Sequence, residues 1–282
     1  MLKPIKIIAD SLSDIPADLR EKYNITVLPL TIIFGAEEFK DGIDLTTQDF
    51  FNKLTTSKQT PSTSQVTPND FIVEIDKALK EGFEVIVING SSQVSGTHQS
   101  AVIAKNQFDI DEVTIIDTLA LSYGCGMIVV EAAKMAKEGR TKEDILQTIE
   151  NMKLRMDHIF SVETLEYLKR GGRLSPTKAA IGTIFNVKPI LTIEGGKVEP
   201  LDKVRGSKKI ISRMIELAHE RGIKKGIKRI GLGHGANLSG LEKLKEEIIK
   251  EFDPEEIILT EVGCTIGTHT GPGLLVMFYL RD

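Results

Sequence analysis

The alternation of short β-branched runs with amphipathic stretches constrains the fold of this chain more than any other feature. Four such runs occur in the first half, namely IKIIA at 5–9, TVLPLTIIF at 26–34, EVIVING at 84–90 and EVTIID at 112–117. Strands that are continuously apolar and separated by helices belong to mostly parallel sheets covered on both faces. The first half therefore predicts an α/β layer in which each run is one strand.

Helix start signals between these runs support the same interpretation. Thr67 is followed by Pro68 and Asp70, which gives an N-cap, a proline in the first turn and an acidic third position. Thr141 with Asp144 repeats the arrangement further along the chain. Both sites predict helices that follow directly.

A second block of strands and helices begins near residue 155. KPILTIEGGKVEPLDKVR at 188–205 predicts a hairpin with a Gly-Gly turn, and Ser207 is expected to cap the next helix. RIGLGHGA at 229–236, EIILTEVG at 256–263 and LLVMFYL at 274–280 predict further strands. We therefore expect an α/β protein of two α/β domains: residues 1–155 with a mostly parallel sheet flanked by helices, and residues 156–282 with a mixed sheet and helices.

Composition excludes several classes of function. The 282 residues carry a formal net charge of −4, which is not the basic footprint of a nucleic-acid-binding protein. Cys125 and Cys264 lie far apart with no Cys/His cluster, so we expect two core residues in a reducing compartment, with neither a metal site nor a disulfide. The N-terminus lacks a signal-peptide pattern, and no apolar run approaches the roughly 20 residues of a membrane span. A soluble cytoplasmic protein is expected.

Hydroxyl-rich loops follow the predicted strands, where α/β sheets usually bind ligands. The loop GSSQVSGTHQS at 90–100 carries Ser92, Ser95 and Gly96, and the loop TPSTSQVTP at 60–68 carries Thr63 and Ser64. Small residues at a helix start let backbone N–H groups face an anion, but the lysine of a phosphate-binding loop is missing. Neutral donors fit a carboxylate better than a polyphosphate. Helix capping and turn formation would explain the same residues.

Two further residues could act on such an anion. His269 lies between threonines in the segment GCTIGTHTGPG, which predicts a glycine-rich loop after a strand, and Arg173 follows a glycine pair that ends a helix. A histidine there could donate a hydrogen bond or move a proton, and an arginine could reach the anion or stabilise the helix end. His98, His219 and His234 are expected to be structural.

Nine motifs together resemble the DegV family, the fatty-acid-binding proteins that serve bacterial fatty-acid kinase. They extend in order over about the whole chain: ADS, DGIDLT, the polar loop at 62–68, SSQVSGTHQSA, IDTLALSYGCG, YLKRGGRLS, KPILTIEGGKVEP, KVRG and THTGPG. The resemblance implies that two α/β domains bury a long-chain fatty acid similar to palmitate, stearate or oleate. It also implies no cofactor, no catalysis by the chain alone and only transient membrane contact.

The resemblance also implies roles for particular residues. Thr63 and Ser95 would meet the carboxylate, with Ser64, Ser92 and Gly96 in the same loops. His269 would lie close by and Arg173 would face the same site, where both would support phosphoryl transfer from the kinase subunit. The acyl phosphate would then pass to a downstream acyltransferase for phospholipid synthesis. Lys203 and Arg205 would dock the kinase, although a solvated face explains them equally well.

Burial of the fatty-acid tail would contribute strongly to the free energy of binding. At about 0.8 kcal/mol per methylene, a chain of roughly 16 carbons gains about 12 kcal/mol on leaving water. The segment KAAIGTIFNVKPIL offers a candidate lining in Ala180, Ile181, Ile184 and Phe185. These residues would serve equally well as ordinary core. Val66, Thr118 and Leu274 depart from the usual family residues, which leaves the preferred chain length open.

Two other functions remain possible from the residues alone. A serine acyltransferase or hydrolase would use Ser95 or Ser92 as nucleophile and His269 as base, oriented by Asp10 or Asp117, although no G-x-S-x-G motif occurs. A nucleotide-binding module is suggested only by the strand and helix alternation, which is a weak argument for function.

Overall fold

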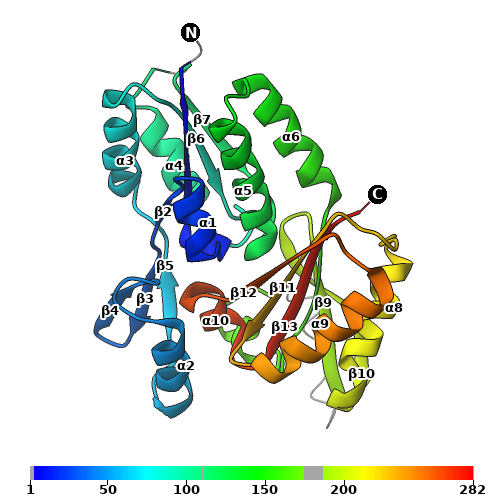
Figure 1. Ribbon diagram of the computed structural model, residues 1–282. Helices are drawn as coiled ribbons and strands as arrows, with labels where there is room; N and C mark the ends of the chain where they lie inside the picture. Colours follow the sequence, from blue (N-terminus) through cyan, green and yellow to red (C-terminus); the bar gives the residue numbers. More distant parts are fainter. Residues whose placement is uncertain (1–2, 110, 175–186, 282) are drawn as a thin grey trace.

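The N-terminal part of the computed structural model is built on a four-stranded parallel sheet (Figure 1). The structure describes residues 3–109, 111–174 and 187–281. The strand order is β2-β1-β6-β7, with bounds Thr26–Leu28, Ile5–Asp10, Glu84–Asn89 and Val113–Asp117. This confirms the predicted parallel layer.

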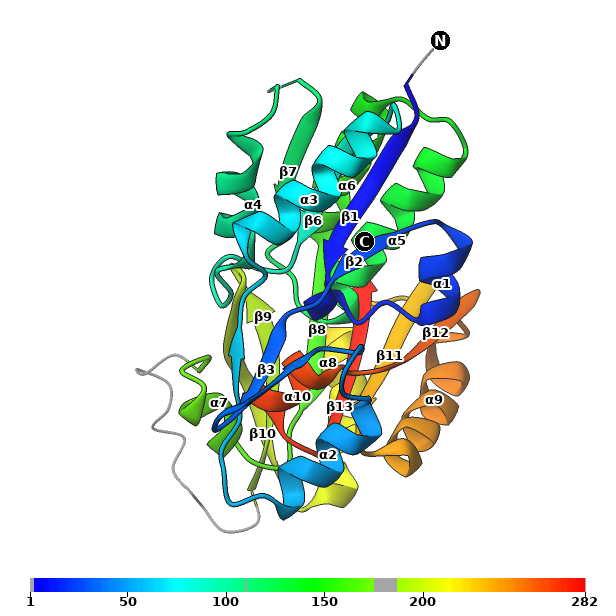
Figure 2. The same ribbon diagram turned by 90° about the vertical axis from the view of Figure 1, so that its left-hand side faces the viewer.

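Helices cover both faces of this sheet (Figure 2). On one face lie α3 (Pro68–Lys80) and α4 (Thr97–Lys105), and on the other lie α5 (Tyr123–Lys137) and α6 (Lys142–Arg155). Thr67 and Asp70 form the predicted capping box, and the hydroxyl of Thr141 accepts from the amide of Asp144. The short elements η1 (Ser11–Ser13) and α1 (Ala17–Lys22) follow β1.

The C-terminal part is a six-stranded mixed sheet, as expected. Its order is β10-β9-β8-β13-β11-β12, with bounds Lys197–Arg205, Val187–Glu194, Met156–Ser161, Leu274–Leu280, Arg229–Gly235 and Glu256–Glu261. Helices α8 (Ile210–Glu220) and α9 (Leu238–Phe252) cover one face, where a second core cluster includes Met214, Leu244 and Tyr279. The predicted cap at Ser207 is wrong, because Ser207 opens the short helix η2 (Ser207–Lys209) and makes no capping bond to α8.

A third sheet was not predicted. The run at 26–34 is two strands, β2 in the parallel sheet and β3 (Thr31–Phe34) in a separate antiparallel sheet of order β4-β3-β5. Pro29 lies between them and has no N–H with which to continue the ladder, so the chain changes sheets there. The other members of this sheet are β4 (Glu37–Lys40) and β5 (Ser62–Ser64), connected through α2 (Thr47–Thr56).

The segment predicted as a glycine-rich loop is instead the helix α10 (Cys264–Thr270). It contacts α2, β3 and β5 of the first half, as well as α7 (Glu166–Arg170), and it lies between the three-stranded sheet and the six-stranded sheet (Figure 1). The largest core cluster accordingly joins residues from both sides of residue 155, among them Phe50, Met127, Phe160 and Cys264. The division at 155 remains a prediction about domains, although α6 does end there and β8 begins.

Candidate functional site

An apolar cavity lies where the first half of the chain meets the six-stranded sheet. Its empty volume is about 720 Å³, which includes space open to solvent. One wall is the face of the sheet carrying Phe160, Val276 and Phe278, and the opposite wall comes from the loops after β1, β6 and β7, with Leu12, Val94 and Leu121.

Strand alternation explains why the sheet offers this wall. Successive side chains of a strand point to opposite faces. Leu274, Val276 and Phe278 of β13 line the cavity, whereas Met277 and Tyr279 belong to the core beneath α8 and α9. A strand buried on both faces therefore contributes one face to the core and the other to a space that could hold an apolar ligand.

One end of this cavity is polar. Thr63 of β5 and His269 of α10 are 206 positions apart in sequence, yet the Thr63 hydroxyl lies 2.9 Å from His269 Nε2. Ser95 and Arg173 line the same cavity. Four of the residues singled out from the sequence therefore line one cavity: Thr63 and His269 are in contact, and Arg173 donates to the carbonyl of Val94, the residue before Ser95.

His269 is neutral at pH 7 because its surroundings disfavour the charged form. Burial, with a smaller contribution from the positive charge of Arg173, lowers the pKa of His269 to about 4. Its Nδ1 has no hydrogen-bond partner among the described residues, and a Cβ built on Gly171 would lie 2.3 Å from that atom. The glycine of the YLKRGGR motif thus leaves room for the imidazole.

Arg173 is half-buried and held by two carbonyl groups. Its Nε donates to the carbonyl of Val94 at 3.2 Å, and its Nη1 donates to the carbonyl of Gly171. Burial lowers the pKa of Arg173, but guanidinium stays charged in proteins. The chain can turn toward the cavity here because Gly172, at φ +69°, occupies the left-handed region directly after α7.

The hydroxyl loop after β6 contributes Ser95 but not its neighbour Ser92. The Ser95 hydroxyl lies 3.1 Å from that of Thr97 at the start of α4 and accepts from the Thr97 amide, so it both starts the helix and lines the cavity. Ser92 is exposed, and its amide donates to Asp117 at 3.2 Å. Ser92 does not line the cavity, and its contact with a carboxylate stays a prediction that this geometry does not support.

Ser64 and Gly96 also do not line the cavity. Ser64 is exposed because it follows Thr63 on β5, where neighbouring side chains face opposite ways. Gly96 packs against Gln65, whose Oε1 would lie 1.8 Å from a Cβ at that position. Their predicted contact with a carboxylate has no support in this geometry, because the polar end is built from one residue of each loop. The predicted lining Ala180, Ile181, Ile184 and Phe185 lies outside the described residues.

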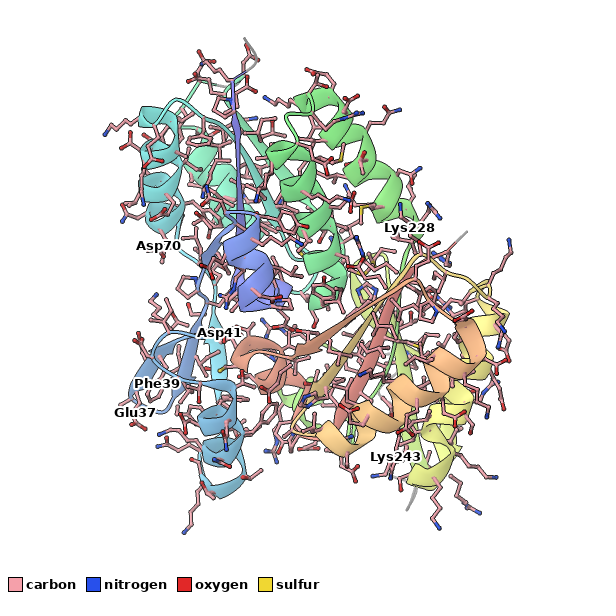
Figure 3. All side chains as sticks on the ribbon, in the orientation of Figure 1. Glu37, Phe39, Asp41, Asp70, Lys228 and Lys243 are labelled. Atoms are coloured by element: carbon pink, nitrogen blue, oxygen red, sulfur yellow. The ribbon has the colours of Figure 1, made fainter. Side chains whose placement is uncertain are left out.

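Two buried aspartates that the sequence reasoning did not assign to the site hold the start of α10. Asp41 accepts from the amides of Cys264 and Thr265 at 3.0 and 3.2 Å and from the Thr265 hydroxyl at 2.6 Å. Asp14 accepts from the amide of Gly263 at 2.8 Å. Figure 3 shows Asp41 where the three-stranded sheet meets α10. Carboxylates at a helix N-terminus are stabilising, so they fix the helix that carries His269.

Sequence reasoning also missed His158 and Ser122, which line the cavity. His158 belongs to β8, and burial lowers its pKa to about 4. Ser122 precedes α5 at φ +51° and donates its hydroxyl proton to Asp14. Ser122 lies in the motif IDTLALSYGCG and His158 at the start of the second half of the chain, and only the approach of β8 to the loop after β7 brings them together.

The geometry does not assemble the residues of a serine hydrolase. Among the residues whose placement is described, His269 Nε2 bonds to Thr63, whereas the hydroxyl of Ser95 bonds to Thr97. Asp10 accepts from Asn89, Gly90 and Leu12, and Asp117 accepts from the backbone amides of Ser92 and Leu119, so neither aspartate has a histidine among these partners. A relay from carboxylate through imidazole to serine therefore does not form here.

Residues 3–109, 111–174 and 187–281 contain no candidate metal site and no candidate membrane-spanning helix. No group of three or more His, Cys, Asp or Glu side chains there could hold a metal ion. No helix in that part of the chain is both long and apolar enough to cross a bilayer. Cys125 and Cys264 are free and buried, and burial raises the pKa of both thiols.

Sequence comparison finds a family and relatives that match nearly the whole chain. A sequence profile of the DegV family, described as uncharacterised proteins, matches residues 4–282. A DegV domain-containing protein of Caldanaerobacter subterraneus subsp. tengcongensis is 40% identical over 278 residues, which are 99% of each chain.

Solved structures agree with that match. A DegV family protein from Thermus thermophilus, described by its fatty acid binding, is 33% identical with a TM-score of 0.92, covering 99% of this chain and 100% of that one. DegV of Bacillus subtilis, described as a fatty acid binding protein, is 31% identical with a TM-score of 0.88 over the same shares of the two chains. This chain therefore belongs to the DegV family.

Proposed function

We propose that this protein binds one long-chain fatty acid in the cavity and presents its carboxylate to a separate fatty-acid kinase. The observation that carries the proposal is an apolar cavity with a polar end at which Thr63, Ser95, Arg173 and His269 meet. The fatty acid binding described for the Thermus thermophilus and Bacillus subtilis relatives supports the same ligand class.

The polar end suits a carboxylate in its ionised form. Hydroxyl groups of Thr63 and Ser95 can each donate to a carboxylate oxygen, and the guanidinium of Arg173 offsets its charge. The acyl chain would lie along Val276 and Phe278, which removes it from water.

The chain is proposed to act as a lipid-binding subunit without turnover of its own. Among the described side chains, the Ser95 hydroxyl bonds to Thr97 and not to a histidine, which favours presentation over hydrolysis by a serine nucleophile. A kinase would phosphorylate the carboxylate, with His269 and Arg173 stabilising the added charge. The acyl phosphate would then serve an acyltransferase of phospholipid synthesis in the cytoplasm. No cofactor is needed in this scheme beyond the bound fatty acid.

Mass spectrometry of the intact protein under native conditions, followed by solvent extraction, tests the binding. We expect one fatty acid per chain, and we expect the Ser95→Ala variant to retain about tenfold less of it, because a hydrogen bond to a charged group is worth about 1.5–3 kcal/mol. The exposed Ser92 gives a matched control, and Ser92→Ala should retain the parent amount. Recovery of no lipid, or equal retention by both variants, would refute the carboxylate assignment. Steady hydrolysis of acyl esters by the isolated protein would favour the hydrolase instead.

A further inference from the structure

A second polar side chain lines the cavity, besides those proposed to bind the carboxylate. His158 is 3% exposed, lines the cavity, and has an Nδ1 without a hydrogen-bond partner among the described residues. A buried polar atom without a hydrogen-bond partner is destabilising and uncommon, so we expect a ligand atom to bond to this Nδ1.

The other edge of the imidazole is fully occupied by protein. His158 Nε2 lies 3.3 Å from the carbonyl oxygen and 3.4 Å from the amide nitrogen of Leu121, and a Cβ on Gly124 would come within 2.1 Å of it. The ring also packs edge-on against Phe278, with centroids 5.6 Å apart. These contacts fix the ring on the cavity wall and leave Nδ1 as the nitrogen that is not satisfied.

Strand geometry separates this point from the carboxylate end. Leu274, the first residue of β13, follows α10 closely, whereas His158 is opposite Phe278 in the β8–β13 register. Four residues along a strand span about 13 Å at roughly 3.3 Å per residue. A ligand held at His269 would therefore reach His158 only with a part well along its chain.

The chemistry at this point matches a hydroxyl group. The two contacts of Nε2 allow either neutral tautomer, so Nδ1 is either an acceptor or a donor, and a hydroxyl can serve both. The adjacent Ser122 gives its proton to Asp14 and keeps lone pairs that can accept. Burial keeps His158 uncharged at neutral pH, since its pKa is about 4.

We propose that the cavity accommodates a fatty acid with a hydroxyl group well along its chain, and that His158 is the partner of that hydroxyl. This inference rests on the proposed fatty-acid binding and narrows it to oxygenated chains. In a wholly apolar tunnel a hydroxyl would lose its hydrogen bonds with water and weaken binding. His158 Nδ1 compensates for that loss.

Competition binding to delipidated protein tests the proposal with stearate, 2-hydroxystearate, 10-hydroxystearate and 12-hydroxystearate as ligands. Each variant is judged by the ratio of its Kd for stearate to its Kd for a hydroxystearate, which cancels general effects on folding. In the parent protein we expect 10- or 12-hydroxystearate to bind at least as tightly as stearate, and 2-hydroxystearate to show no dependence on His158. The His158→Leu variant should lower the ratio for the favoured isomer about tenfold, and His158→Gln should restore most of it.

The outcomes separate this inference from the proposed function. If stearate binds and the ratio is the same in the parent and in His158→Leu, the histidine is only a wall residue and the inference is wrong. If no ligand in the set binds, fatty-acid binding itself fails, and this inference fails with it.

Discussion

Removing the charge of Asp41 gives the sharpest test of how α10 is held in place. In Asp41→Asn only one of the two side-chain oxygens remains, so an amide of Cys264 or Thr265 faces an NH2 group. A buried donor without an acceptor costs about 1–3 kcal/mol. Loss of a negative charge at a helix N-terminus costs about 0.3–1 kcal/mol more. We expect a total near 3 kcal/mol.

Thermal unfolding measures that cost directly. In a chain of this size about 1 kcal/mol corresponds to roughly 2 °C, so Tm should fall by about 6 °C. Because α10 carries His269, acyl-phosphate formation with a partner kinase should slow as well. Asp44→Asn is the matched control, since Asp44 is exposed and accepts one bond, from the Lys40 amide at 2.8 Å. If both variants unfold at the same temperature, Asp41 does not hold the helix as its contacts indicate.

Three further predictions concern the polar end. With a partner fatty-acid kinase, Arg173→Ala and His269→Ala should form acyl phosphate at least tenfold more slowly while losing less lipid than Ser95→Ala; unchanged rates would remove these residues from the transfer step. Gly171→Ala should displace His269, because the new Cβ would lie 2.3 Å from its Nδ1, and a parent-like histidine NMR signal would contradict this. Because the His269 pKa is about 4 in the folded state and near 6.5 when unfolded, stability should fall by up to about 3 kcal/mol as pH drops from 6.5 to 4. In urea unfolding measured at pH 6.5 and at pH 4, His269→Gln should lose less stability than the parent protein. An equal loss in the two proteins would mean that His269 is not buried in its neutral form.

Local patterns determined most of the secondary structure. The β1, β6 and β7 strands, the capping box at Thr67, the cap at Thr141, and the hairpin of β9 and β10 all follow from short-range periodicity and turn chemistry. The run at 26–34 predicts one strand because it is apolar on both sides of Pro29. The effect of Pro29 depends on which sheet each side can join. Periodicity reports burial, and it does not report the partner strand.

Helix α10 shows what local reasoning misses. Its glycines and threonines are poor helix formers, and its N-terminal amides are satisfied by Asp14 and Asp41, 249 and 223 positions earlier in the chain. Such a cap exists only after the two halves have packed together. The helix therefore could not be read from the segment itself.

The sequence by itself determined that this chain is an α/β protein with uncharged hydroxyl loops and no cationic phosphate loop, because strand periodicity, capping and composition are local properties. The tertiary structure alone decided that Thr63, Ser95, Arg173 and His269 share one end of an apolar cavity, and that Ser64 and Ser92 do not. Side-chain direction and the packing of distant elements set those neighbours, and neither is encoded in the spacing of residues along the chain.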